Sequence, residues 1–216
     1  MMTGRGPRAW AVLALVAVLG AGAVSGCSAD DDASAGSQVT SASWARQVVT
    51  GTTMWTVSKD GWTITAYDMG RGTAERDSFF SDDATGEPLV AEGDPIVFVN
   101  VVATNTGDAT GFVGIDEPSL WAMPLDSPYT QGVERVTPAT DRQMRDHQVW
   151  YHSVMSNADD RLPYTVAPGE SFAMGYVLPL SLGDEWVFVP SLRVYQTKET
   201  TMGSGLVFDR QSFTFG

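Results

Sequence analysis

Hydrophobic and polar residues alternate along much of the chain with the two-residue period of β-strands. In residues 62–67, Trp, Ile and Ala alternate with Thr, Thr and Tyr, which predicts a strand that covers a core with one face. Lys59-Asp60-Gly61 joins this run to Thr52–Ser58 and supplies the glycine that a hairpin turn needs. The run Ile96–Ala103 is apolar on both faces, as expected of a central strand, and the turn residues 105–108 follow it.

Five further apolar runs, each bounded by turn residues, are predicted strands. Pro168-Gly169, Gly183-Asp184 and Gly203-Ser204-Gly205 mark the clearest boundaries. The sequence has no strongly amphipathic helical segment and no internal repeat of fixed period. We therefore predict an all-β fold, an antiparallel β-sandwich with Greek-key connections, and a barrel is the alternative that the pattern leaves open. The five runs are Ser119–Met123, Phe172–Leu178, Trp186–Val189, Leu192–Gln196 and Leu206–Phe215.

The segment from Thr140 to Met155 fits neither period cleanly. As a helix it would be capped by Thr140, with Met144 and Tyr151 among the residues along one face. As a strand, neither face of residues 145–154 is cleanly apolar. We expect this segment to be an excursion inserted between strands.

The first 26 residues have the composition of a signal peptide. Arg5 and Arg8 precede fifteen apolar or glycine positions from Trp10 to Val24, and no acidic residue stands before them. A membrane-spanning helix needs about 20 apolar residues. The run is too short for that role, and we predict that it is cleaved.

Directly after the run stands Val24-Ser25-Gly26-Cys27, which resembles the lipobox of bacterial lipoprotein precursors. The resemblance implies that a peptidase cuts between Gly26 and Cys27 and that Cys27 carries a diacylglyceryl group on its sulfur. Cys27 is the only cysteine, which excludes an intramolecular disulfide. The alternatives are a chance match after an ordinary secretory signal and a buried free thiol. The position at the end of the apolar run favours lipidation, and two or three acyl chains anchor a protein stably.

Residues 28–43 contain one large apolar side chain, Val39, among sixteen residues. Such a segment cannot build a hydrophobic core. We therefore predict three parts: a signal peptide at 1–26, a lipidated cysteine and flexible, disordered linker at 27–43, and a β-sandwich domain at 44–216.

Three segments of the predicted domain resemble uncharacterised immunoglobulin-like domains of bacterial lipoproteins and secreted antigens. In residues 98–107 an apolar strand ends in Asn-Thr-Gly, residues 166–171 contain a Pro-Gly turn, and residues 177–180 end the strand that follows. The resemblance implies an immunoglobulin-like β-sandwich at the cell envelope and carries no established reaction. Residues 111–162 depart from a minimal domain of this kind, which leaves the topology there open.

Acidic residues outnumber basic residues by 26 to 13, a formal net charge of −13. No basic surface can dominate such a chain, which excludes electrostatic binding of nucleic acid. Removal of residues 1–26 leaves 11 basic and 26 acidic residues, a charge of −15. Anionic lipid repels such a surface, so we expect the lipid anchor to hold the protein at the extracytoplasmic face of the cell membrane.

The sequence predicts no catalytic residue, no metal site and no cofactor. His147 and His152 are five positions apart, which points them to opposite faces of a strand and separates them by about 140° on a helix. They therefore do not form a metal pair. No G-x-S-x-G elbow and no phosphate-binding glycine loop in a suitable context is present. A hydrolase whose Ser, His and carboxylate meet only in the fold is the alternative.

Acidic pairs recur in the predicted loops. We expect them to be solvated surface charge, because they lack the ligand spacing of a calcium-binding loop. Calcium binding by two loops that converge in space is the alternative. The pairs are Asp82-Asp83, Asp116-Glu117, Asp159-Asp160 and Asp184-Glu185.

Trp150 and Tyr151 are the candidate binding surface. They lie in residues 140–155, where neither period buries both rings, whereas Trp62 and Trp186 lie in runs typical of a core. Exposed aromatic rings anchor protein partners or stack on sugars. The expected function is binding of a surface protein or a small ligand by a lipid-anchored module. The alternative is a structural accessory subunit of an envelope or transport complex that has no ligand of its own.

Overall fold

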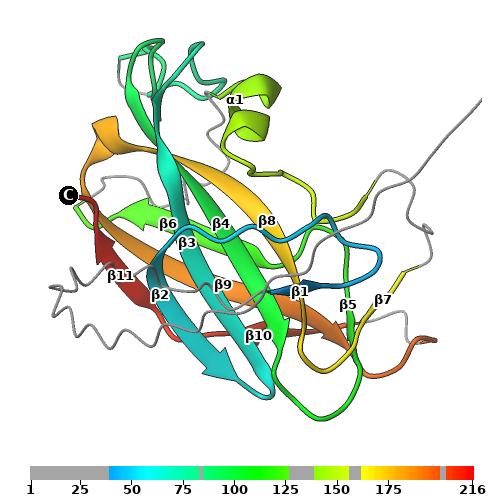
Figure 1. Ribbon diagram of the computed structural model, residues 1–216. Helices are drawn as coiled ribbons and strands as arrows, with labels where there is room; N and C mark the ends of the chain where they lie inside the picture. Colours follow the sequence, from blue (N-terminus) through cyan, green and yellow to red (C-terminus); the bar gives the residue numbers. More distant parts are fainter. Residues whose placement is uncertain (1–38, 83–84, 127–138, 156–161, 200–202) are drawn as a thin grey trace, which may run out of the picture. The chain divides into compact units, whose positions relative to one another are not determined.

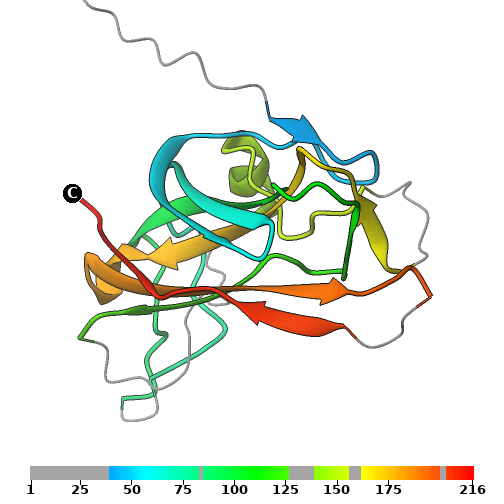
Figure 2. The ribbon, with the colours of Figure 1, turned by 90° about the horizontal axis from the view of Figure 1, so that it is seen from below.

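The computed structural model describes residues 39–82, 85–126, 139–155, 162–199 and 203–216. These residues form a five-stranded and a six-stranded sheet (Figure 1), which confirms the predicted all-β sandwich. Seen from below, the two sheets form separate layers (Figure 2). The strands are β1 (Thr40–Ser41), β2 (Thr52–Lys59), β3 (Trp62–Thr73), β4 (Pro95–Asn105), β5 (Gly111–Val113), β6 (Ser119–Pro124), β7 (Tyr164–Val166), β8 (Glu170–Pro179), β9 (Glu185–Tyr195), β10 (Ser204–Val207) and β11 (Gln211–Thr214); the helices are α1 (Asp141–Asp146) and the short 3₁₀ helix η1 (Leu180–Leu182).

The five-stranded sheet has the strand order β1-β8-β4-β3-β2, which places β4 at its centre as predicted. The hairpin of β2 and β3 turns at Asp60 and Gly61, both of which have positive φ, as this type of turn requires. β3 continues beyond its predicted end to Thr73, with a register shift between Asp68 and Arg71. An irregularity of this kind bends a strand and redirects its side chains.

The sheet extends into residues that the sequence assigned to the linker. Thr40 and Ser41 pair in parallel with the start of β8, and the N–H of Ala42 donates to the carbonyl of Ser171 at 2.8 Å. Every other ladder between the described strands is antiparallel. The short β1 satisfies backbone groups at an edge of β8 that would otherwise be open.

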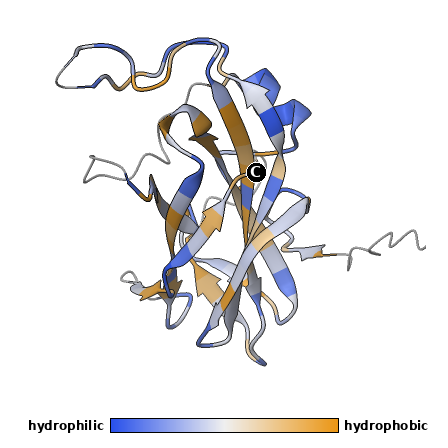
Figure 3. Cartoon of the chain, turned by 90° about the vertical axis from the view of Figure 1, so that its left-hand side faces the viewer, coloured by the Kyte–Doolittle hydropathy of each residue, from blue (hydrophilic) through white to orange (hydrophobic). Residues whose placement is uncertain are grey.

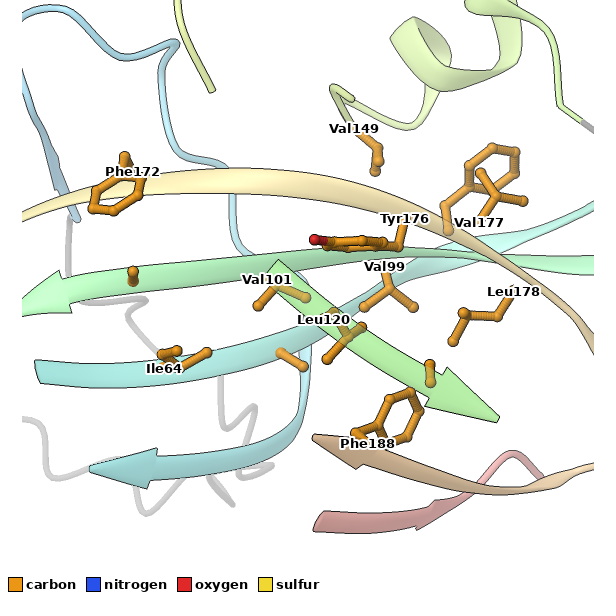
Figure 4. Packing of buried hydrophobic residues seen from close by; sticks show 14 of the residues in the cluster. Ile64, Val99, Val101, Leu120, Val149, Phe172, Tyr176, Val177, Leu178 and Phe188 are labelled. Atoms are coloured by element: carbon orange, nitrogen blue, oxygen red, sulfur yellow. The ribbon is translucent and has the colours of Figure 1, made fainter. Parts of the chain in front are cut away.

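β4 is apolar on both faces because both faces are covered. Val99 and Val101 lie on the side of Leu120 from β6, in the core between the sheets (Figure 4). On the opposite face, the ring of Phe98 stacks on His147, with ring centroids 3.9 Å apart. All residues from Ile96 to Ala103 are buried, which confirms the prediction of a central strand.

Residues 140–155 begin as a helix and continue as extended chain. The hydroxyl of Thr140 accepts from the N–H of Gln143, and the Gln143 side chain accepts from the N–H of Thr140, which is a capping box. After α1 ends at Asp146, the chain runs along β8, and the carbonyl of Trp150 accepts from the N–H of Gly175 at 2.6 Å. A Cβ at position 175 would collide with this segment. The helical alternative therefore applies only to the first turns of the segment.

The six-stranded sheet is organised around β9, which pairs with β5 and β6 on one side and with β10 and β11 on the other. Two predictions are wrong here. The runs Trp186–Val189 and Leu192–Gln196, expected as two strands, belong largely to the single strand β9, and the run Leu206–Phe215, expected as one strand, is divided between β10 and β11. The gap between β10 and β11 lies opposite Val189 and Pro190. Pro190 has no N–H to donate to a neighbouring strand. The pairing strand is therefore interrupted between β10 and β11, while β9 itself continues without a break.

Aromatic side chains fill the core between the sheets. Trp62 and Trp186, predicted as core residues, are 4% and 1% exposed. Trp44 stacks on Tyr164 of β7 with ring centroids 4.5 Å apart, and its indole N–H donates to a backbone carbonyl of the same strand at 2.6 Å. The three-residue strands β5 and β7 were not predicted, because so few residues show no period.

Phe188 provides a test of the core. It is fully buried on β9 and packs beside Trp55, with ring centroids 5.7 Å apart. We expect Phe188→Ala to lower the free energy of unfolding by about 3–5 kcal/mol through lost burial and the cavity left behind. The same change at Phe79, which is 92% exposed, is the matched control and is expected to stay within about 0.5 kcal/mol. Urea unfolding followed by tryptophan fluorescence measures both, and equal losses would contradict the described packing.

Candidate functional site

The predicted surface residues Trp150 and Tyr151 are both half-buried. The guanidinium of Arg46 lies over the Trp150 ring, 4.6 Å from its centroid. Tyr151 packs against the core, and its hydroxyl is buried without a hydrogen-bond partner among the described residues. Burial raises the pKa of Tyr151 to about 12. Both rings therefore take part in packing residues 140–155 onto the sandwich, and each remains partly exposed.

A shallow open groove of about 610 Å³ lies where the irregular part of β3 meets two other segments. It is lined by residues 49–52, 68–71 and 146–148. The carboxylate of Asp68 accepts from the N–H of Gly70 at 2.8 Å and pairs with Arg71 at 3.4 Å. Arg71 also lies over the ring of Phe215 at 5.0 Å. Asp68 and Arg71, two of the polar residues that line the groove, thus make contacts within the protein.

The two histidines are held apart in separate structural contacts. Nδ1 of His147 lies 3.1 Å from the carbonyl oxygen of Met69, and Nδ1 of His152 lies 3.1 Å from the carboxylate of Asp116. Neither imidazole hydrogen-bonds to a hydroxyl within the described chain. The described residues also contain no group of three or more His, Cys, Asp or Glu side chains arranged to hold a metal ion.

The acidic pairs differ in their environments. Asp184 and Glu185 are exposed, as expected, whereas Asp159-Asp160 lie outside the described residues. Glu117 is 5% exposed, so the prediction of solvated charge is wrong at this residue. Its carboxylate accepts from the N–H of Ser119 at 3.1 Å. Burial raises the pKa of Glu117, and backbone hydrogen bonds from Arg193 and Ser119 oppose the rise.

The connection from β3 to β4 forms a projecting arm, which we define as residues 74–82 and 85–94. The arm lies beside α1 at one end of the sandwich (Figure 1) and projects away from the sandwich (Figure 3). Its two sides are joined at Ser78, whose N–H donates to the carbonyl of Val90 at 2.8 Å and whose hydroxyl accepts from the Val90 N–H at 3.1 Å. Farther out, the N–H of Leu89 donates to the carbonyl of Phe80 at 2.9 Å. The arm therefore has a defined backbone.

The start of α1 braces the base of the arm. The hydroxyl of Thr140 donates to the carboxylate of Glu75 at 2.7 Å, and the guanidinium of Arg142 pairs with the same carboxylate at 2.6 Å. These two partners, Thr140 before Arg142, lower the pKa of Glu75. Arg76 donates to the carbonyl of Ala139 at 3.1 Å. Charge-assisted hydrogen bonds to residues 139–142 thus fix the base of the arm.

The arm carries the most exposed aromatic side chains in the described chain. Phe79 is 92% exposed and Phe80 is 50% exposed, and their rings make an edge-to-face pair with centroids 5.8 Å apart. Val90, in contrast, is fully buried at the root of the arm. Sequence reasoning missed this pair. The available signal was two adjacent phenylalanines between polar residues in a stretch with no strand period.

The residues of the predicted anchor, Gly26 and Cys27, lie outside the described residues, as does the predicted signal peptide. No helix in the described part of the chain is long and apolar enough to cross a membrane. No protein-family model matches the chain, and neither a curated protein nor a solved structure is significantly similar to it. The resemblances to bacterial lipoproteins and to immunoglobulin-like domains therefore stay predictions.

Glu117 predicts a pH-dependent difference in stability. Its pKa in the folded protein lies above the ordinary value of 4.5, so burial of the charged form costs free energy at neutral pH, and this cost disappears as the pH falls through the folded pKa towards 4.5. We expect Glu117→Gln to be more stable than the parent protein at pH 7, with the difference shrinking as the pH falls to about 4. Thermal unfolding across this range measures it.

Glu185→Gln is the matched control, since this glutamate is exposed. The control is expected to show no comparable change. An advantage of Glu117→Gln that grows as the pH is lowered would contradict the sign derived for the buried carboxyl.

Proposed function

We propose that this protein is a lipid-anchored interaction module at the extracytoplasmic face of the cell membrane, and that the Phe79–Phe80 pair on the arm is its principal contact. The observation that carries the proposal is the exposure of these two rings, 92% and 50%, on a braced projection. A phenylalanine gains about 1.5–3 kcal/mol from burial. Two adjacent exposed rings therefore supply a large part of the apolar anchor that a protein interface needs.

The backbone of the arm supports this role. The Ser78 hydroxyl, which accepts from the Val90 N–H, also donates to the carbonyl of Phe80 at 2.7 Å, so a side chain fixes the backbone on both sides of Phe79. A preordered contact loses less conformational freedom on binding. The arm therefore presents its rings at low entropic cost.

The proposed location rests on the sequence. The apolar run to Val24, the lipobox-like Val24-Ser25-Gly26-Cys27 and the polar residues that follow have the order of a lipoprotein precursor. A chain with 26 acidic and 13 basic residues gains no attraction from anionic lipid. A covalent lipid on Cys27 supplies the attachment that the charge of the chain does not.

Replacement of Cys27 tests the location. We expect the parent protein to sediment with membranes and its mature N-terminus to be an acylated Cys27 by mass spectrometry. Cys27→Ala is expected to release most of the protein from the membrane fraction, because the anchoring acyl chains are lost. A mature parent protein without lipid would refute the anchor.

The contact is tested by placing a photoreactive benzophenone analogue of phenylalanine at position 79 of the full-length protein in its native cells. We expect a discrete protein adduct after illumination. Additional Phe80→Ala should reduce its yield about tenfold or more, since truncation of a central anchor costs about 2 kcal/mol.

The control is the same analogue at position 207, where Val207 is 55% exposed on β10. This position is expected to give no comparable adduct. Equal adducts from positions 79 and 207, or none from 79, would refute the arm as the contact.

A further inference from the structure

Acidic side chains surround the aromatic pair. Residues 74–94 contain seven acidic residues and one arginine, a formal net charge of −6. Asp77, which is exposed, stands two positions before Phe79, and exposed Glu87 lies across the arm, where its carbonyl accepts from the N–H of Asp82 at 2.8 Å. The exposed rings are thus flanked by negative charge on both sides of the arm.

We infer that the partner of the arm is a protein surface with an apolar pocket rimmed by lysine or arginine side chains. The inference rests on the proposed function and names the chemistry of its partner. Phe79 and Phe80 would enter the pocket, because buried aromatic rings provide most of the energy at such anchors. The carboxylates of Asp77 and Glu87 would face the rim, where opposite charges speed and orient association.

Charge disfavours the two other occupants of such a surface. A second copy of the proposed mature chain would bring another arm of charge −6 on a protein of net charge −15, and like charges repel. The same carboxylates would repel an anionic membrane surface that approached the rings. The negative charge of the arm thus disfavours both occupants, and it complements a cationic protein pocket.

The position-79 adduct of the full-length protein provides the test in envelope membranes of its native cells. We expect its yield to fall about threefold or more between 0.05 and 0.5 M NaCl, because salt screens the charges at the rim. Asp77→Asn combined with Glu87→Gln should lower the yield similarly at low salt. The Asp77 carboxylate accepts from the N–H of Glu92 at 2.8 Å, and the side-chain amide that replaces it retains an oxygen for this hydrogen bond.

The matched control is Asp60→Asn combined with Asp108→Asn. Both are exposed aspartates in turns that lie at the end of β3 and β4 farthest from the arm. The control therefore removes two negative charges, as the arm variant does, but at a distant site. Its adduct yield is expected to match the parent protein. Equal losses in the control and in the arm variant would show a general charge effect and overturn the inferred rim.

The identity of the adduct decides between the occupants. Sequencing of the crosslinked peptide by mass spectrometry is expected to show apolar residues flanked by Lys or Arg. A protein adduct that neither salt nor the double substitution at Asp77 and Glu87 weakens would overturn the inferred rim and leave the proposed function intact. An adduct with lipid or with a second copy of this chain would overturn the inferred partner, and no adduct at any salt would refute both the function and the inference.

Discussion

The buried side chain of Asn100 fixes the arrangement on which the outer part of the structure depends. It is 2% exposed at the centre of β4, and its amide nitrogen donates to the carbonyls of Val49 and Gln148 at 2.9 and 3.4 Å. A buried amide without partners costs several kcal/mol, so these bonds hold two distant segments against the outer face of the five-stranded sheet. With Phe98 stacked on His147 beside them, that face becomes a second, smaller core. β4 can then be apolar at nearly every position.

The same covering segment determines what remains at the surface. Residues 140–155 pack Tyr151 against the core and place Trp150 under a guanidinium, which leaves both rings half-buried. At its other end, the segment grips the base of the arm through Thr140 and Glu75. Residues 140–155 thus partly bury two aromatic rings and also stabilise the base of the arm that carries Phe79. Two charged residues that line the groove beside β3, Asp68 and Arg71, pair with each other.

The sequence was informative where a run was long enough to show a period and uninformative where a distant partner decides the outcome. Ile96–Ala103 could be predicted as a central strand because all but one of its positions are apolar. The unbroken β9 could not, since the neighbouring strands provide the gap opposite Pro190. Glu117 gave no sign of burial, because its backbone partners include Arg193, far away in the chain. The half-buried state of Trp150 depends likewise on Arg46. The lipobox-like motif that ends at Cys27 is a local pattern that involves no distant residue, so the sequence alone could predict the proposed anchor.

An exposed aromatic pair on a surface protein is a liability unless something prevents indiscriminate association. Membrane attachment of the proposed kind raises the local concentration of the chain, and exposed apolar groups then promote self-association. The arm counters this tendency with seven acidic residues in 74–94, since charges beside an apolar stretch suppress aggregation. Such protection is selective: it repels copies of the same acidic chain and anionic lipid, yet attracts a cationic surface. The negative charge beside Phe79 and Phe80 is therefore also the feature that would select the proposed partner.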